Sequence, residues 1–322
     1  MKFTQLPKDG ASWQEPLRYK FSTESTEPEN LKVEIRDETL QQTIATLNLY
    51  ATTTGDIDIA PYLRDRLRLT PITSIRAILL AISPSAIAVS VVVNGVRSAV
   101  RHFFRSAHDY NHIGMLSYHA ATRSVRRGDA IRLTLFAKAN IMVTINYNSV
   151  VPTTPTQHSL LTKGMPAEIV IPTEQLRSTN SLEITILYDG TKTETVTYMI
   201  EAANSASRCL VWYNPMGGIE SYTFGHSLRL GYSISAEEIA GVGTEMLRCV
   251  EGKQRHRLCT GYDTSKEIAR VMELLLSPMV LSEQSGLCTP IEIENREVIF
   301  DSKGMLHSFA LDISEPWKGG KL

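Results

Sequence analysis

The segment Cys209–Phe224 reads CLVWYNPMGGIESYTF and predicts two short strands joined by a tight turn. The first strand is apolar and aromatic, and Gly217 and Gly218 give the turn unrestricted φ angles. Trp212, Tyr222 and Phe224 are expected to pack across the resulting hairpin. The segment holds no acid, base or nucleophile in a catalytic arrangement, so it predicts architecture and not a reaction.

Upstream of this hairpin, apolar and polar residues alternate with period two over about 200 residues, as in strands with one buried face. The dipeptides Asn94-Gly95 and Asp189-Gly190 favour tight hairpin turns. About seven strands fall within the first hundred or so residues, the number typical of a β-sandwich. We therefore expect a mainly β protein with one β-sandwich at residues 1–107 and a second at residues 108–203. The alternation is clearest at Leu17/Tyr19/Phe21, Leu31/Val33/Ile35, Ile131/Leu133/Leu135 and Leu182/Ile184/Ile186.

Two local expectations concern connections within these sandwiches. Pro61, followed by Leu63 and Leu67 at i,i+4 spacing, predicts one short helical turn. Lys138–Asn140 is expected to join the strand before it to the strand after it as a hairpin loop.

Downstream, the chain changes in kind. Residues 202–207 are small and polar, which is typical of a linker. Thr264-Ser265-Lys266-Glu267 fits a capping box, and apolar residues then recur with helical spacing as far as Leu275. Ser277-Pro278 ends the helix. We expect residues 204–322 to form an α+β module with one clear helix.

Composition limits the classes of partner. The net charge is −1, so the charge of the chain does not indicate nucleic acid as its main partner. No run of about 18 apolar residues predicts a transmembrane helix, and the N-terminus lacks the apolar core of a signal peptide. Cytoplasmic synthesis and no membrane partner are the expectations. The cysteines are expected to be reduced thiols, with a bridge between the second and third as the alternative: Cys209, Cys249, Cys259 and Cys288.

Histidines gather between the two expected sandwiches. His108 and His112 have the i,i+4 spacing that places two imidazoles on one helix face, with His102 and His119 on either side. However, Asp109 belongs to a poor helix start, and the glutamate of an H-E-x-x-H motif is absent. A solvated loop without metal is the expectation.

Arginines and aromatics interleave in the same region, as in proteins that bind single-stranded nucleic acid. Protein interfaces favour the same residue types. Because the whole chain is not basic, we expect a protein interface and no nucleic acid, with candidate interface residues Arg101, Phe103, Phe104 and Arg105.

Nucleophiles are present but lack a recognisable setting. Ser117, Ser124 and Cys209 stand in no G-x-S-x-G elbow, and Gly241-x-Gly243 lacks the rest of a phosphate loop. We therefore expect no enzymatic activity, no catalytic residues and no cofactor.

The hairpin segment also resembles a known family. Its pattern W-x-N-x-x-G-G-x-x-x-Y-x-F is similar to one in phage-tail-like structural proteins from prophage regions, and here it consists of Trp212, Asn214, Gly217, Gly218, Tyr222 and Phe224. The resemblance covers about residues 207–316 and extends to Ser277-Pro278-Met279-Val280 and Pro290-Ile291-Glu292-Ile293. Pro215 departs from the pattern and alters the turn.

The resemblance implies a non-enzymatic structural or assembly protein of a phage-derived particle, in its tail or baseplate region. Its partners would be copies of itself, as a homo-oligomer, and other particle proteins. The alternative is a carbohydrate-binding or adhesin-like β-sandwich protein, which predicts a groove lined by exposed Tyr or Trp. An enzyme would instead predict a pocket of convergent titratable groups.

Overall fold

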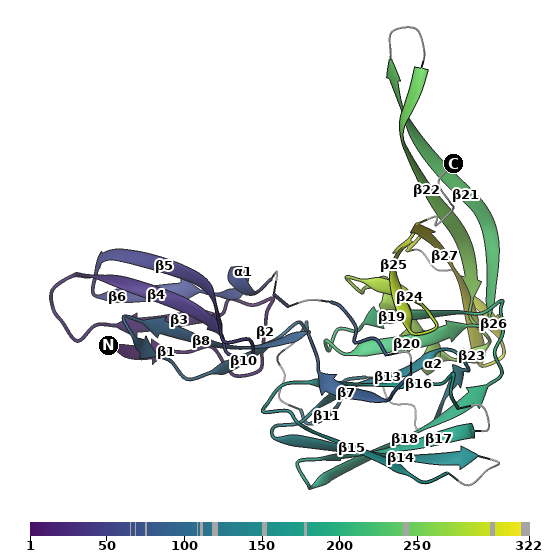
Figure 1. Ribbon diagram of the computed structural model, residues 1–322, viewed down its shortest axis with the longest axis horizontal. Helices are drawn as coiled ribbons and strands as arrows, with labels where there is room; N and C mark the ends of the chain where they lie inside the picture. Colours follow the sequence, from purple (N-terminus) through teal and green to yellow (C-terminus); the bar gives the residue numbers. More distant parts are fainter. Residues whose placement is uncertain are drawn as a thin grey trace.

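The computed structural model describes residues 1–64, 66–67, 69–74, 76–107, 109, 112–117, 122–149, 153–176, 179–240, 245–296 and 300–316. The protein is mainly β, with two consecutive β-sandwich modules followed by an α+β module, which confirms the predicted fold class. Figure 1 shows an elongated molecule with the first sandwich at one end. The second sandwich and the α+β module lie together at the other end, and a long hairpin rises from the α+β module.

The first sandwich packs a three-stranded sheet against a six-stranded sheet. The smaller sheet has the order β1 (Lys2–Gln5), β3 (Arg18–Ser22), β6 (Thr54–Asp58). The larger has the order β2 (Ala11–Ser12), β10 (Arg101–Phe104), β8 (Ala86–Val93), β4 (Glu29–Asp37), β5 (Gln42–Thr52), with β9 (Val96–Arg97) beside β8. The alternating residues predicted to share a face are buried between the sheets, among them Tyr19, Phe21, Val33 and Ile35.

Three local predictions can be compared with this structure. The expected helical turn is α1 (Ala60–Leu63), with Pro61 in its first turn. Asn94 and Gly95 have φ angles of 46° and 86° and close the β8–β9 hairpin, while Asp189 and Gly190 have 50° and 68°. Both hairpin predictions are confirmed, since both turns use the left-handed region that Asn, Asp and Gly tolerate best.

The second sandwich contains a four-stranded and a five-stranded sheet. The first has the order β11 (Gly114–Met115), β13 (Ala130–Phe136), β16 (Ala167–Pro172), β7 (Leu79–Ile82). The second has the order β12 (Thr122–Arg126), β18 (Lys192–Glu201), β17 (Thr179–Tyr188), β14 (Asn140–Ser149), β15 (Thr156–Leu161). Strand β7 precedes β8 of the first sandwich in sequence, yet it pairs with β16, with Ile82 opposite Ala167.

The predicted hairpin loop at Lys138–Asn140 is wrong. Strand β13 before it pairs with β11 and β16, whereas β14 after it pairs with β15 and β17. The connection therefore crosses from one layer of the sandwich to the other. Every residue of β13 is buried, because the α+β module covers the outer face of its sheet.

The α+β module is built on a nine-stranded sheet. Its order is β20 (Ile219–Phe224), β19 (Arg208–Tyr213), β24 (Val280–Gln284), β25 (Leu287–Ile293), β27 (Leu306–Pro316), β22 (Glu245–Cys259), β21 (His226–Ala240). Strands β23 (Asp263–Thr264) and β26 (Phe300–Lys303) pair with β27.

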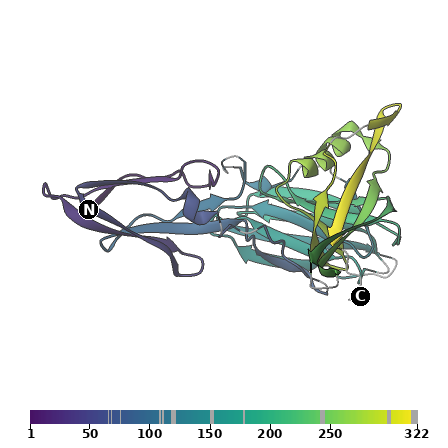
Figure 2. The same ribbon diagram turned by 90° about the horizontal axis from the view of Figure 1, so that it is seen from above.

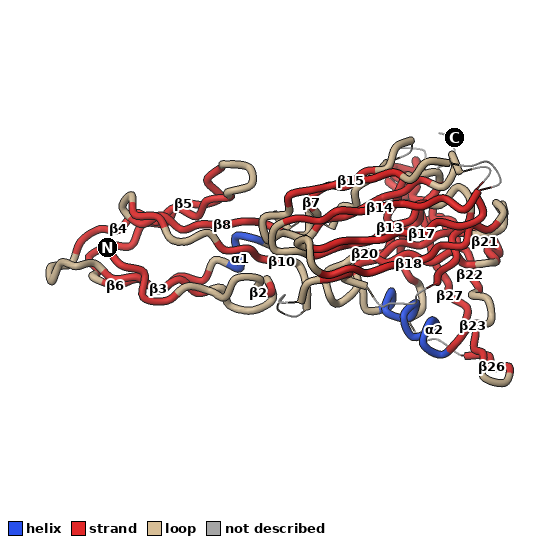
Figure 3. The backbone as a smooth tube through the Cα atoms, turned by 90° about the horizontal axis from the view of Figure 1, so that it is seen from below, coloured by secondary structure: helices blue, strands red, loops and turns tan. Residues whose placement is uncertain are grey.

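The predicted helix is α2 (Ser265–Met272), continued by a 3₁₀ turn at Glu273–Leu275. Thr264 is its N-cap and accepts a hydrogen bond from the Glu267 N–H at 3.3 Å, as predicted. The reciprocal bond of a capping box does not form, because the Thr264 N–H donates to Asp263 Oδ1 at 2.7 Å and the Glu267 carboxylate accepts from Arg270. Ile268 and Val271 are buried against the sheet. Figures 2 and 3 show α2 on the outer side of the module. No helix among the described residues is long and apolar enough to cross a membrane.

Candidate functional site

The W-x-N segment forms the predicted hairpin. Strands β19 and β20 pair antiparallel from Arg208 opposite Phe224 to Tyr213 opposite Ile219. Trp212 and Phe224 are fully buried in one apolar cluster, against which the ring of Tyr222 packs. The aromatic residues therefore hold the sheet against α2, and Trp212 and Phe224 present no surface to solvent.

Asn214 organises the turn between the two strands. Its Oδ1 accepts a hydrogen bond from the Gly218 N–H at 2.9 Å, and its carbonyl oxygen accepts one from the Gly217 N–H at 2.9 Å. Its Nδ2 donates to the carbonyl oxygen of Leu116, in the second sandwich, at 2.7 Å. Pro215 accepts with its carbonyl from the Ala107 N–H at 2.7 Å, so the residue that departs from the family pattern also ties the turn to a neighbouring module.

The two glycines are required because other modules approach the turn closely. A Cβ on Gly218 would lie 2.1 Å from the Leu116 carbonyl oxygen, and one on Gly217 would lie 2.8 Å from the Arg105 carbonyl oxygen. Gly217 also has a φ angle of 79°. The turn thus meets the end of the first sandwich and the start of the second, and we call Arg105, Leu116 and Asn214–Gly218 the three-module joint.

The candidate interface residues lie beside this joint, but they contact their own chain. Phe103 and Phe104 are 0% and 3% exposed, so the expectation that they face another subunit is wrong. Phe104 packs edge-on against Phe136 of the second sandwich, with ring centroids 5.7 Å apart. Arg105 lies over the Trp13 ring and donates to the Leu67 carbonyl, and Arg101 is half-buried. Phe103 packs in the core of the first sandwich and Phe104 points the other way, against the second sandwich, because adjacent strand residues point to opposite faces.

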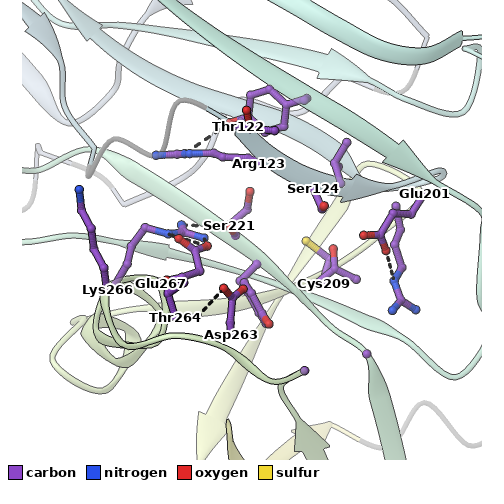
Figure 4. A pocket seen from close by; sticks show the side chains of 18 of the residues that line it. Thr122, Arg123, Ser124, Glu201, Cys209, Ser221, Asp263, Thr264, Lys266 and Glu267 are labelled. Atoms are coloured by element: carbon purple, nitrogen blue, oxygen red, sulfur yellow. Dashed lines mark hydrogen bonds and ion pairs between the residues drawn. The ribbon is translucent and has the colours of Figure 1, made fainter. Parts of the chain in front are cut away.

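A cavity of about 580 Å³ lies between the second sandwich and the α+β module. Strands β12 and β18 line one side, and β20 and α2 line the other. Figure 4 shows hydroxyl, carboxylate and guanidinium groups from both sides turned toward it. Its size is ordinary for a small-molecule site, so its chemistry decides what it can do.

The charged groups of the cavity wall are paired with one another. Glu220, which is fully buried, lies 2.8 Å from Arg270 and 3.6 Å from Arg123. Arg270 also donates to both carboxylate oxygens of Glu267, at 3.0 and 3.1 Å. Burial alone would lower the pKa of Arg270, but its hydrogen bonds to Glu267 and the charge of Glu220 raise that pKa above its ordinary value. The network is a closed set of buried ion pairs that joins two modules.

Two further titratable groups lie near this wall. Burial raises the pKa of the Cys209 thiol well above its usual range, so the sulfur is a neutral thiol and not a nucleophile. Burial raises the pKa of Asp129 to about 6, although the hydrogen bond from Thr223 Oγ1 at 2.6 Å opposes this. Each of these groups packs in the interior, and they do not converge with a histidine.

The predicted histidine cluster does not assemble in the described part of the chain. His102 contacts Asp9 through Nδ1 at 3.0 Å, and His112 is exposed. His108 and His119 lie outside the described residues. Among the residues that the structure describes, no group of three or more His, Cys, Asp or Glu could hold a metal ion.

Sequence reasoning missed the buried charges. Besides the Glu220 network, Arg132 in β13 donates from Nε and Nη2 to the two carboxylate oxygens of Glu283 in β24, at 3.1 and 3.3 Å. Arg132 stands between the apolar residues Ile131 and Leu133 and was not predicted to be buried. The sequence did carry a signal for this pair. An arginine within an apolar strand that is covered on both faces is buried, and a buried arginine requires a carboxylate partner.

Sequence reasoning also missed the length of the β21–β22 hairpin. Strand β22 pairs with β27 only from Lys253 to Cys259. Beyond this, residues 234–240 and 245–252 pair only with each other among the described residues, and we call them the distal ribbon. Figure 1 shows it rising away from the body of the protein. The Gly-rich bend expected at Gly241 and Gly243 lies outside the described residues.

Large apolar side chains are exposed along β21. Tyr232 is 48% exposed and Ile234 is 58% exposed. By register they stand opposite Gln254 and Gly252, and therefore on the face that carries buried Leu258 nearer the body. The face that packs the core thus continues outward without anything in the described chain to cover it.

Comparison with known proteins adds little. No family model and no curated protein sequence matches the chain. Among solved structures, one match is a chain from the complex of Dpr2 Ig1-Ig2 with DIP-Theta Ig1-Ig3, at 8% identity over 63% of this chain and 99% of that chain, with a TM-score of 0.20. Another is DIP-gamma IG1+IG2, at 9% identity over 63% and 97%, with a TM-score of 0.16. A third is the E. coli alpha-2-macroglobulin, at 8% identity over 80% and 21%, with a TM-score of 0.18. Similarity at these scores carries no argument about function.

Proposed function

We propose that this chain is a non-enzymatic structural protein of a phage-derived particle, in the tail or baseplate region, that acts through protein–protein contacts. The W-x-N-x-x-G-G segment suggests the family, and the distal ribbon supplies the physical argument. Its partners are other copies of the chain and other particle proteins.

The observation that carries the proposal is a long two-stranded ribbon that leaves the body, with Tyr232 and Ile234 exposed where it begins. A two-stranded hairpin alone is marginally stable in water, because it buries little apolar surface. Exposed edges with apolar side chains are also prone to pair with other strands. A protein that retains such a ribbon gains from it when another subunit covers it.

In the rest of the molecule, the modules are held rigidly against one another. The three-module joint fixes the modules by backbone contacts at Gly217 and Gly218. Two buried arginine–carboxylate sets, around Glu220 and Glu283, cross the boundary between the second sandwich and the α+β module. These contacts favour a rigid platform over a site that must open for turnover.

The second candidate is a carbohydrate-binding or adhesin-like protein, and the polar cavity is the observation that favours it. Sugar sites usually present a flat aromatic face, and here the described tryptophans offer none. Trp212 is fully buried, and Trp13 lies under the Arg105 guanidinium at 5.0 Å. In the cavity wall, Tyr222 stacks edge-on against Phe224. We therefore prefer the structural role over carbohydrate binding.

The test is to measure assembly with and without the distal ribbon. Replacing residues 234–252 by Asn-Gly should close a tight hairpin between Ser233 and Lys253, which are opposite each other. The intact chain, alone or mixed with the products of its neighbouring genes, should form defined oligomers by light scattering and electron microscopy, and the shortened chain should not. A monomer in every mixture, combined with selective binding on a glycan array, would favour the second candidate.

A further inference from the structure

We propose that the open edge of β21 is a self-association site, at which β21 of one copy pairs antiparallel with β21 of a second copy. The inference rests on the proposed function and names its partner as this same chain. Strand β21 ends the nine-stranded sheet, with β22 as its neighbour in the described chain. Its other side presents a row of backbone N–H and C=O groups beyond Ser227, whose N–H donates to the Ala206 carbonyl oxygen at 2.6 Å.

The edge is long enough to form a specific contact. Strand β21 spans 15 residues, and at about 3.3 Å per residue it extends for roughly 50 Å. Among the described strands of ten or more residues, only β5 and β21 end a sheet. Pairing along β21 would convert the distal ribbon from two strands to four, which relieves its marginal stability.

The charge pattern of β21 selects the direction of pairing. Arg229 lies near the body, and Glu237 and Glu238 lie toward the tip. Antiparallel pairing of two copies places the base of each strand, which carries Arg229, beside the acidic end of the other. Parallel pairing would place like charges together, which is destabilising. An antiparallel arrangement also has the two-fold symmetry of a closed dimer.

Apolar residues fall between these charges. Tyr232 and Ile234 share one face of β21 and are about half exposed, as described above. A bulge between Arg229 and Gly231 places Arg229 on this face as well, opposite His256. Ser233 stands midway along the strand, so a two-fold axis near it brings the two apolar segments together.

The other candidate edges fit less well. The edge of β20, at the far side of the same sheet, is closed by the second sandwich, where the Ile219 N–H donates to Thr134 Oγ1 at 2.8 Å. Head-to-tail extension of the sheet from copy to copy is therefore blocked. Strand β5 carries no charged residue between Gln42 and Thr52, so it offers no partner to Arg229 or to the two glutamates. Strand β21 itself supplies both charges.

The first experiment reverses the charges and then restores the match. Sedimentation equilibrium at low salt should give a dimer for the unsubstituted chain. Arg229→Glu alone, and Glu237→Arg with Glu238→Arg, should each weaken the dimer by about tenfold or more, a loss of about 1.4 kcal/mol. The variant that combines Arg229→Glu, Glu237→Arg and Glu238→Arg should recover most of the affinity, because charges of opposite sign again lie side by side. Lys303→Glu, an exposed charge reversal on β26, is the matched control and should leave the dimer unchanged.

The second experiment tests the symmetry without changing any charge. Ser233→Cys should form an intermolecular disulfide under mild oxidation, since a residue near the two-fold axis meets its own copy. The unsubstituted protein, with its native cysteines, and Ser302→Cys on exposed β26 should not cross-link.

Three outcomes would overturn the inference: a triple variant that stays monomeric although circular dichroism shows it folded, dimers insensitive to every substitution, or no cross-link at position 233. If the chain forms dimers through a surface other than β21, the inference about β21 is wrong but the proposed function is not contradicted. A chain that forms no assembly alone or with its neighbours would remove both.

Discussion

The three-module joint and the β21–β22 hairpin belong to one module and have opposite surroundings. In the joint, the backbones of Arg105 and Leu116 approach so closely that the turn admits only glycine. In the β21–β22 hairpin, Gly231 stands between exposed residues, and a Cβ on it would meet nothing within 4 Å. The turn of the joint is enclosed by its own chain, whereas the distal ribbon pairs only with itself among the described residues.

This difference shows what each region contributes. We expect the joint and the buried ion pairs beside it to contribute most to the stability of the monomer, because they are desolvated and paired within the chain. The distal ribbon pairs only with itself among the described residues, so we expect it to add little to that stability. Substitutions should therefore separate folding from association, and the expected effects on stability fall steadily from the joint outward.

The largest effect is expected at Glu220. Glu220→Gln would leave Arg270 and Arg123 as buried charges without their shared carboxylate, and we expect a loss of about 3–5 kcal/mol in the free energy of unfolding. Urea denaturation followed by tryptophan fluorescence measures it. Glu292→Gln is the control, because it breaks an exposed pair with Lys253 and should change stability little. Equal losses in both variants would contradict the assigned role of burial.

Next in size is the close approach at Gly218. Gly218→Ala would place a methyl group against the Leu116 carbonyl oxygen, where neither backbone can move freely, and should cost about 3 kcal/mol. Gly261→Ala is a matched control, since nothing lies within 4 Å of its added Cβ. If the two variants denature at the same urea concentration, the modules do not meet as described.

A smaller effect depends on pH. Burial raises the pKa of Asp129 to about 6 from an unfolded value of 3.8, so the folded state holds the proton more tightly. The resulting stability is present below the unfolded pKa and is lost as the pH rises through about 6. Asp129→Asn should therefore be the more stable protein at about pH 8, by about 1–2 kcal/mol, and should lose this advantage at about pH 4.

Asp189 provides the opposite sign as a control. Burial would raise its pKa, but hydrogen bonds from the N–H groups of Asn140, Ala139 and Lys138 outweigh this and lower it. Asp189→Asn should thus be destabilised at neutral pH, with the difference shrinking in acid. Thermal unfolding across pH would count against both assignments if the two variants shifted in the same direction.

The smallest effect is expected in the distal ribbon. Replacing residues 234–252 by Asn-Gly should change the free energy of unfolding of the monomer by no more than about 0.5 kcal/mol, because it removes few buried contacts. Denaturation at a protein concentration below the dimer range measures this value. A loss as large as that of Gly218→Ala would mean that the ribbon is part of the core.

The sequence predicted those parts of the fold whose partners are near in the chain. Alternating residues, the Asn94-Gly95 turn and the Thr264 cap all act over a few residues, and each prediction is confirmed. Features that depend on distant partners could not be found in this way. Arg132 resembles a solvated strand residue until Glu283 is placed beside it, and Lys138–Asn140 resembles a hairpin until the two layers are assigned.

The candidate site divides in the same manner. The importance of Gly217 and Gly218 was visible in the sequence, because paired glycines mark a turn, but the reason for them lies in the approach of Arg105 and Leu116. The cavity, its closed ion pairs and the length of the ribbon were not visible. They arise where modules meet or where the sheet ends, and both are properties of tertiary structure.

Strand β7 can pair only after a much later part of the chain has been synthesised. Leu79–Ile82 leaves the ribosome about ninety residues before β16, to which it must pair, so the nascent chain has to keep this apolar segment available until residue 172 is made. A fragment that starts at residue 108 would lack it, and the edge of β16 would then be bare. The first two modules are therefore separate in shape but cannot mature independently.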